Sequence, residues 1–180
     1  MKNNLSSVMC FILFIVLTGC ANKEFSEILR DDQIETIVHK EVVDNGVVIF
    51  YVPNREGEDS AKVDFEARFI QKNLFGWKAT YDRGGTTATL DTNLYSQYLM
   101  KNSDKSPFPL LFGEITTPKI TTVKIEYGNE TKIKEAKIVE NKGKKFWFAF
   151  IEEPKEKIKY TIKGYSKSGQ VIEKAEQEAG

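Results

Sequence analysis

The sequence predicts a mainly β protein. Three observations lead to this prediction: apolar and polar residues alternate over short runs, turn-forming residues separate the runs at intervals of roughly ten to fourteen residues, and only one longer stretch is patterned like a helix. Short strands at such spacing are typical of a β-sandwich or a small barrel. We therefore expect antiparallel hairpins in an N-terminal β-rich module, then a small β-sandwich-type module, with one short helix between them.

Residues 1–19 have the three parts of a secretory signal peptide. Lys2 provides a basic start, residues 8–17 carry no charge, and the small residue Gly19 precedes Cys20. As a helix, such a run of about ten residues spans only ~15 Å, about half of the hydrocarbon core of a bilayer. The run is therefore too short for a permanent transmembrane helix, and we expect cleavage between Gly19 and Cys20.

The tetrad Leu17-Thr18-Gly19-Cys20 resembles the lipobox of bacterial lipoproteins. The resemblance implies that Cys20 becomes the first residue after cleavage and is the site of lipid attachment, with two or three acyl chains as a lasting membrane anchor. It also implies a location at the extracytoplasmic face of the bacterial cell membrane. An ordinary cleaved signal peptide is the alternative.

The N-terminal half is expected to begin with a tether. Residues 20–32 are mostly polar and charged, and we expect them to form a lipid-anchored tether that holds the body off the membrane. Residues 33–105 are predicted to form the N-terminal β-rich module. Within it, Asn45-Gly46 stands between β-branched runs and predicts a hairpin, because both residues tolerate positive φ.

The rest of this module is predicted to contain a second hairpin and the helix. Residues 63–69 and 75–81 each alternate between large apolar or aromatic and polar side chains, as paired strands do. Gly76 between two aromatic residues indicates a bulge or a close backbone approach. Residues 89–102 carry apolar side chains at helical spacing and predict the short helix.

The C-terminal third returns to strand patterning. Residues 106–114 are predicted to form a Pro-containing linker, because proline disfavours helix in the residue before it. Residues 115–176 are predicted to form the C-terminal β-sandwich-like module, and residues 177–180 a tail. Within the module, residues 146–151 are apolar on both faces and predict a central strand. The broken alternation of residues 133–139 predicts a bulge.

The end of the chain, residues 160–165 followed by 168–172, resembles the final hairpin of immunoglobulin-like and fibronectin-like modules. The resemblance implies that the C-terminal module is a small immunoglobulin-like sandwich. Roughly sixty residues are few for a complete module of that kind. Either the sandwich is truncated, or it shares its core with the N-terminal module.

Three segments of the body, residues 75–78, 107–115 and 146–148, resemble small uncharacterised lipoproteins of Gram-positive, spore-forming bacteria. That resemblance implies no activity, cofactor or site residue for this chain.

Few residues could support catalysis. The sequence has one histidine, His39, and two cysteines, of which Cys10 lies in the signal peptide and Cys20 at the lipid site. The processed body would have no thiol, and a two-histidine metal site is excluded. Lys and Arg total 26, as do Asp and Glu, so no net charge attracts nucleic acid. We expect no cofactor, no metal, no nucleic-acid partner and no enzymatic activity.

The candidates for a ligand or partner surface are aromatic. Trp77, Tyr81 and Arg83 would together form a stacking platform for a sugar or a peptide, unless the aromatic side chains belong to the core. Trp147 lies between two phenylalanines, so one face of its strand is core, and the other is either a second core layer or an exposed interaction patch.

These observations predict a non-enzymatic binding or interaction module at the cell envelope. Its partners would be the lipid membrane, through acylated Cys20, and an envelope protein, a peptide or a wall polymer. One alternative is a transporter accessory lipoprotein that binds a substrate. Another is a carboxylate-based wall hydrolase, because the fold and not the spacing brings two catalytic acids together.

Overall fold

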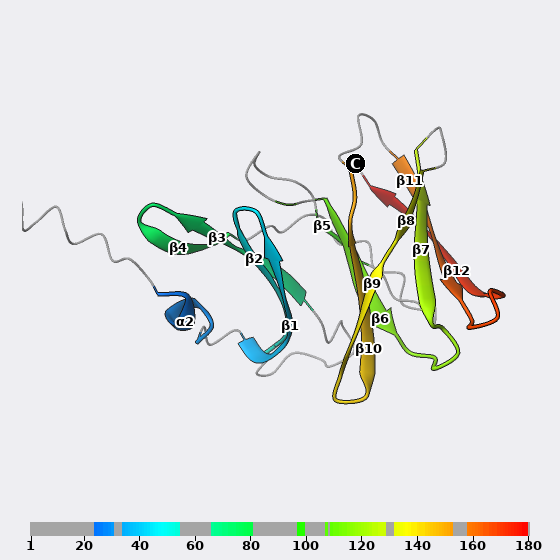
Figure 1. Ribbon diagram of the computed structural model, residues 1–180, viewed down its shortest axis with the longest axis horizontal. Coiled ribbons are helices and arrows are strands. Elements are labelled where there is room, and N and C mark those ends of the chain that lie inside the picture. The colour runs from blue at the N-terminus through cyan, green and yellow to red at the C-terminus, as the bar shows by residue number, and fades with distance from the viewer. Residues whose placement is uncertain are drawn as a thin grey trace, which may run out of the picture.

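A computed structural model describes residues 24–30, 34–54, 66–80, 97–99, 107, 109–128, 132–152 and 158–179 (Figure 1). These residues form three four-stranded antiparallel sheets and one short helix. The prediction of a mainly β protein is confirmed.

The N-terminal sheet, sheet A, is an up-and-down meander in the order β1-β2-β3-β4. Its strands are β1 (Ile34–Val43), β2 (Gly46–Pro53), β3 (Glu66–Asn73) and β4 (Gly76–Thr80), and it is preceded by α2 (Phe25–Ile28). The hairpin predicted at Asn45-Gly46 is confirmed, since Val43 pairs with Gly46 across the turn.

Gly46 has a different role from the one expected. Its φ is not positive, unlike that of Gly76. A Cβ at Gly46 would instead lie 2.1 Å from the carbonyl oxygen of Ile70 on β3. Glycine is required here because the neighbouring strand approaches too closely for any side chain.

The other two sheets face each other as a sandwich. Sheet B has the order β5-β6-β10-β9, and sheet C has the order β12-β11-β7-β8. The strands are β5 (Gln97–Leu99), β6 (Leu110–Ile115), β7 (Thr122–Tyr127), β8 (Lys132–Glu135), β9 (Lys137–Asn141), β10 (Lys144–Phe150), β11 (Ile158–Tyr165) and β12 (Val171–Ala179). With β5 to β12 taken as strands A, B, C, C′, D, E, F and G, these orders are A-B-E-D and G-F-C-C′. This is the strand arrangement of an immunoglobulin sandwich.

The sandwich is assembled differently from the expectation in four places. Residues 110–115 form β6 and pair with β10, so the predicted linker over 106–114 is wrong from Leu110 onward. Residues 97–99 are strand β5, where a helix was expected, and the remainder of 89–102 lies outside the described residues.

The other two differences concern the C-terminal strands. The broken alternation of 133–139 is not a bulge: the chain leaves sheet C at the end of β8 and enters sheet B at β9, and Ala136 between them donates its N–H to Val123 O at 2.9 Å. The predicted tail begins too early, because β12 continues to Ala179.

Sheet B is the middle layer of the body, between sheet A and sheet C (Figure 1). Side chains alternate between the two faces of a strand. Trp147 and Ala149 of β10 therefore belong to the core shared with sheet C, whereas Phe146 and Phe148 pack in the core shared with sheet A. The predicted central strand is confirmed, and the sandwich shares a core with the N-terminal sheet.

Candidate functional site

The helix α2 is docked on the outer face of sheet A. Ile28 is 6% exposed, and it packs with Val47 and Ile49 of β2. The backbone N–H of Glu24 donates to Glu27 Oε2 at 3.3 Å and caps the first turn. A helix of one turn is not stable in isolation, so its packing on the sheet holds it in place.

This docking corrects the expected tether. Phe25, Ile28 and Leu29, within the predicted tether 20–32, pack against the body, so this part of the segment is not a free tether. Gly19 and Cys20 themselves lie outside the described residues.

Trp77 of β4 lies next to this helix. Its ring centroid is 4.8 Å from that of Phe25, and Lys72 Nζ lies 5.6 Å from its ring centroid. Trp77 is half-buried, and Phe25 packs against its ring. The predicted stacking platform needed this ring to be open to a ligand. The other members of that platform, Tyr81 and Arg83, lie outside the described residues.

Trp147 is not a surface residue. It is 0% exposed, within the core between sheets B and C. Its assignment to a partner surface is wrong, because sheet A covers one face of β10 and sheet C covers the other.

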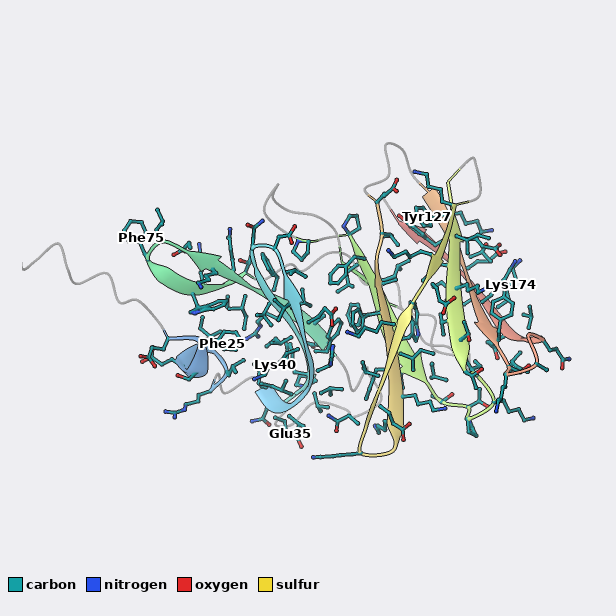
Figure 2. The ribbon with its side chains drawn as sticks, in the orientation of Figure 1. Phe25, Glu35, Lys40, Phe75, Tyr127 and Lys174 are labelled. Atoms are coloured by element: carbon teal, nitrogen blue, oxygen red, sulfur yellow. The ribbon has the colours of Figure 1, made fainter. Side chains whose placement is uncertain are left out.

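The β3–β4 hairpin has an unusual tip that the sequence analysis did not single out. Its two turn residues, Leu74 and Phe75, are 98% and 73% exposed. Figure 2 shows Phe75 at the far end of the hairpin, at the same end of the molecule as Phe25 of α2. The sequence contains a pattern that could have predicted this turn. Asn73 and Gly76 are turn-forming residues, and the two residues between them are apolar.

His39 lies at the junction of sheets A and B. Its ring packs near those of Phe50 and Phe148, at centroid distances of 6.1 and 5.5 Å. Its Nε2 is 2.9 Å from Glu41 Oε2, and Lys137 of β9 donates to the same oxygen at 2.7 Å. Burial would raise the pKa of Glu41, but the hydrogen bonds from Lys137 and His39 outweigh it and lower the pKa below its usual value.

A second polar cluster lies on the α2 side of sheet A. The hydroxyl of Tyr51 donates to Glu66 Oε2 at 2.8 Å, and Arg68 donates to the Tyr51 hydroxyl oxygen at 3.3 Å. Burial, reinforced by the negative charge of Glu66, raises the pKa of Tyr51 above its usual range. The phenol therefore stays protonated, and the cluster cross-links β2 to β3.

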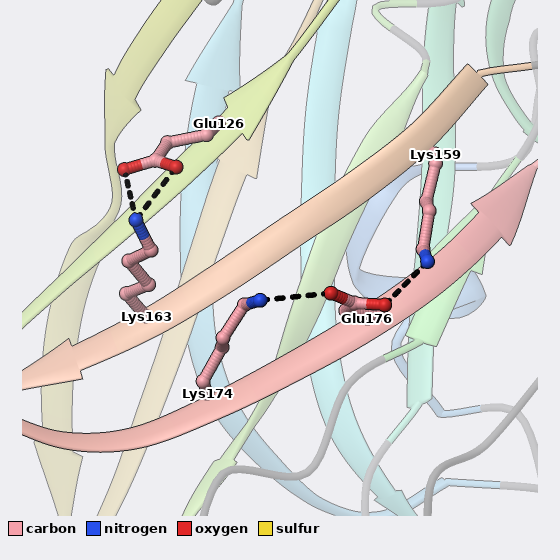
Figure 3. A network of polar contacts seen from close by, with 5 residues as sticks. All are labelled: Glu126, Lys159, Lys163, Lys174 and Glu176. Atoms are coloured by element: carbon pink, nitrogen blue, oxygen red, sulfur yellow. Dashed lines mark hydrogen bonds and ion pairs between the residues drawn. The ribbon is translucent and has the colours of Figure 1, made fainter.

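The outer face of sheet C carries a lattice of opposite charges (Figure 3). Lys163 Nζ donates to both carboxylate oxygens of Glu126 at 2.7 Å. Glu176 is paired with Lys159 and, at 2.8 Å, with Lys174. The hydrogen bond from Lys159 and then that from Lys174 lower the pKa of Glu176 to about 2.

The described surface includes shallow hollows. One, of about 480 Å³, opens beside edge strand β8 and is lined by Ile133, Phe150 and Glu152 among others. Another, of about 370 Å³, lies at the β1–β2 turn beside Glu41.

The described ranges contain neither a cluster of metal ligands nor a membrane-spanning helix. Within them, no group of three or more His, Cys, Asp or Glu side chains is placed to hold a metal ion. In the same ranges, no helix has the length and apolar character needed to cross a bilayer.

No family model, no curated protein and no solved structure matches this chain.

Proposed function

We propose that this protein is a bacterial lipoprotein, held at the extracytoplasmic face of the cell membrane by an acylated Cys20, and that its body is a non-enzymatic binding module of the cell envelope. The observation that carries the proposal is the tetrad 17–20, which ends four residues before Glu24, where the docked helix is capped. Four residues span at most ~14 Å. An anchor at Cys20 would hold sheet A close to the bilayer and leave sheet C as the layer farthest from it.

Two acidic side chains, Glu41 and Glu176, have the features of structural ion-pair partners. A glycosidase needs one carboxyl group that is protonated near neutral pH and can donate to the leaving group. Glu41 and Glu176 are bound by lysines that lower their pKa values. Both are therefore ionised at neutral pH, as a structural ion pair requires and a general acid does not.

The edge of sheet C at β8 is the surface that we propose for partner binding. The hollow beside β8 lies at the edge of sheet C, and exposed Ile133 lies between two lysines there. An envelope protein, a peptide or a wall polymer would meet this edge first if sheet A faces the bilayer. Exposed edge strands of this kind recognise extended chains by backbone pairing.

The test of the anchor replaces each cysteine in turn in the full chain. We expect Cys20→Ala to abolish incorporation of radiolabelled fatty acid and to leave the protein unprocessed or released, because position 20 then has no thiol to accept the lipid. Cys10→Ala is the matched control, and it should be labelled and membrane-bound like the wild type. A Cys20→Ala protein of processed size that is still labelled and firmly membrane-bound would overturn the proposal.

A further inference from the structure

The β3–β4 hairpin carries the only adjacent pair among the large apolar side chains that are strongly exposed in the described part of the chain. Leu74 is 98% exposed and Phe75 is 73% exposed, whereas Val42, Ile133 and Val171 stand singly on other elements. Single exposed apolar residues are ordinary on protein surfaces. An adjacent pair at a turn is not, because turns are normally made of Gly, Pro, Asn, Asp and Ser.

The geometry of the turn holds the pair outward. The side-chain oxygen of Asn73 accepts the backbone N–H of Phe75 at 2.8 Å. Gly76 has a φ of 112°, which residues with a side chain rarely adopt. Lys72 pairs with Trp77 directly behind the turn. The apolar tip is thus part of a well-defined hairpin, in which both flanking residues suit the turn and only the two central ones do not.

The tip lies at the same end of the molecule as α2, the first described element of the chain (Figure 2). Phe25 of α2 packs on Trp77, and Trp77 belongs to the same hairpin as the tip. This step rests on the proposed function: if Cys20 is acylated, at most ~14 Å of chain separates the acyl chains from Glu24. The anchor and the apolar tip then face the same bilayer.

The residues behind the tip suit the polar boundary of a membrane. Trp77 follows the tip in the sequence. Lys72 precedes the tip, and Lys78 comes directly after Trp77. Lys72 Nζ lies 5.6 Å from the Trp77 ring centroid, and Lys40 Nζ lies 5.5 Å from that of Phe25. Tryptophan and lysine are the side chains that favour the headgroup region, with apolar residues below them.

We propose that the β3–β4 hairpin inserts Leu74 and Phe75 into the outer leaflet of the membrane in which Cys20 is anchored. The insertion is a second contact beside the acyl chains. It fixes the orientation of the body, with α2 and sheet A toward the lipid and sheet C away from it. A bilayer is favoured over a protein partner because the anchor already holds this end of the chain at the lipid surface.

The test uses the absence of other thiols in the processed body. Leu74→Cys, in the full acylated chain, is labelled with an environment-sensitive fluorophore and reconstituted into vesicles of phosphatidylglycerol and phosphatidylcholine. Val171→Cys, on sheet C, is the matched control. We expect the label at position 74 to shift its emission to shorter wavelength and to be quenched several-fold less by aqueous iodide than the label at 171. Adding Phe75→Ser to the Leu74→Cys protein should reverse much of this protection.

The outcomes separate this inference from the proposed function. The mass of the N-terminal peptide from the same sample reports whether Cys20 is acylated, and an unmodified peptide would overturn both. If the peptide is acylated and the label at 74 is as accessible to iodide as that at 171, only the insertion is wrong. Protection in native membranes but not in pure lipid vesicles would also overturn it, since the tip would then contact a protein.

Discussion

Sheets A and C are the two outer layers of one body, yet their outward faces have opposite character. Strand β2 of sheet A is buried over residues 46–51, on one face by sheet B and on the other by α2 and its neighbours. Strand β11 of sheet C alternates buried Tyr160 and Ile162 with Lys159 and Lys163, which lie in the charged lattice. A continuous apolar run thus marks a strand covered on both faces, and a strict alternation marks one that has water on one side.

The largest loss of stability is expected when Trp147, which fills the core between sheets B and C, is truncated. We expect Trp147→Ala to lower the free energy of unfolding by about 3–5 kcal/mol, because a fully buried ring is replaced by a cavity. Urea unfolding with linear extrapolation measures this free energy of unfolding. Val171→Ala on the outer surface of sheet C should change stability by less than about 0.5 kcal/mol. Equal effects for the two variants would contradict the buried position of Trp147.

An intermediate effect is expected where two strands of sheet A approach most closely. Gly46→Ala places a Cβ 2.1 Å from a backbone carbonyl oxygen that cannot move without disturbing β3. We expect a loss of about 1–3 kcal/mol, as for other overpacked sites. Gly128→Ala, after β7 in sheet C, is the comparison: its φ is +77° but nothing lies within 4 Å, so the loss should be about 1 kcal/mol. If Gly128→Ala proves the more damaging change, steric approach is not the role of Gly46.

The smallest effects concern two glutamates, one at the junction of sheets A and B and one on the open face of sheet C. The pKa of Glu41 is lowered in the folded protein. Its ion pair therefore stabilises the fold above the unfolded pKa of about 4.3, and this contribution is lost as pH falls through the lower folded pKa. We expect Glu41→Gln to cost about 1 kcal/mol or less at pH 7. Its stability should converge with that of the wild type as pH falls below about 4.

Glu176→Gln is the matched variant on sheet C. The pKa of Glu176 is about 2, so its contribution should be lost only as pH falls from about 4 toward 2. Because Glu176 and its lysines are exposed, added salt should remove the difference from the wild type more completely than at Glu41. Stability profiles against pH at low and high salt, for both variants, would show whether the two glutamates differ in this way. Identical salt dependence would mean that the junction is as open to water as the outer face.

The strands and turns were largely readable from local pattern, whereas the assignment of segments to layers was not. The hairpin at Asn45-Gly46 and the doubly apolar strand at 146–151 were both predicted correctly. The run Leu110–Glu114 was taken for part of a linker because the two prolines before it are a strong breaker signal. It becomes a strand because β10 pairs along its whole length.

The candidate site was predicted less well. Trp147 was assigned to a surface because the pattern of its strand says that both faces are apolar but not what covers them. Leu74 was passed over and Phe75 was assigned to a strand, because apolar residues are expected to be buried, and only the folded hairpin shows that both are exposed turn residues. The residue proposed as the anchor, Cys20, is read from sequence alone.

The class of fold, most of the turns and the alternating strands could therefore be predicted from the amino-acid sequence, since these depend on residues a few positions apart. The sequence also contains the tetrad 17–20 that resembles a lipobox, and it has no cysteine after Cys20. Three features are evident only in the folded chain: sheet B is covered on both faces, the chain changes sheets at Ala136, and α2 and an apolar hairpin tip lie at one end of the body. Each of these depends on contacts between segments far apart in the chain, which local alternation does not specify.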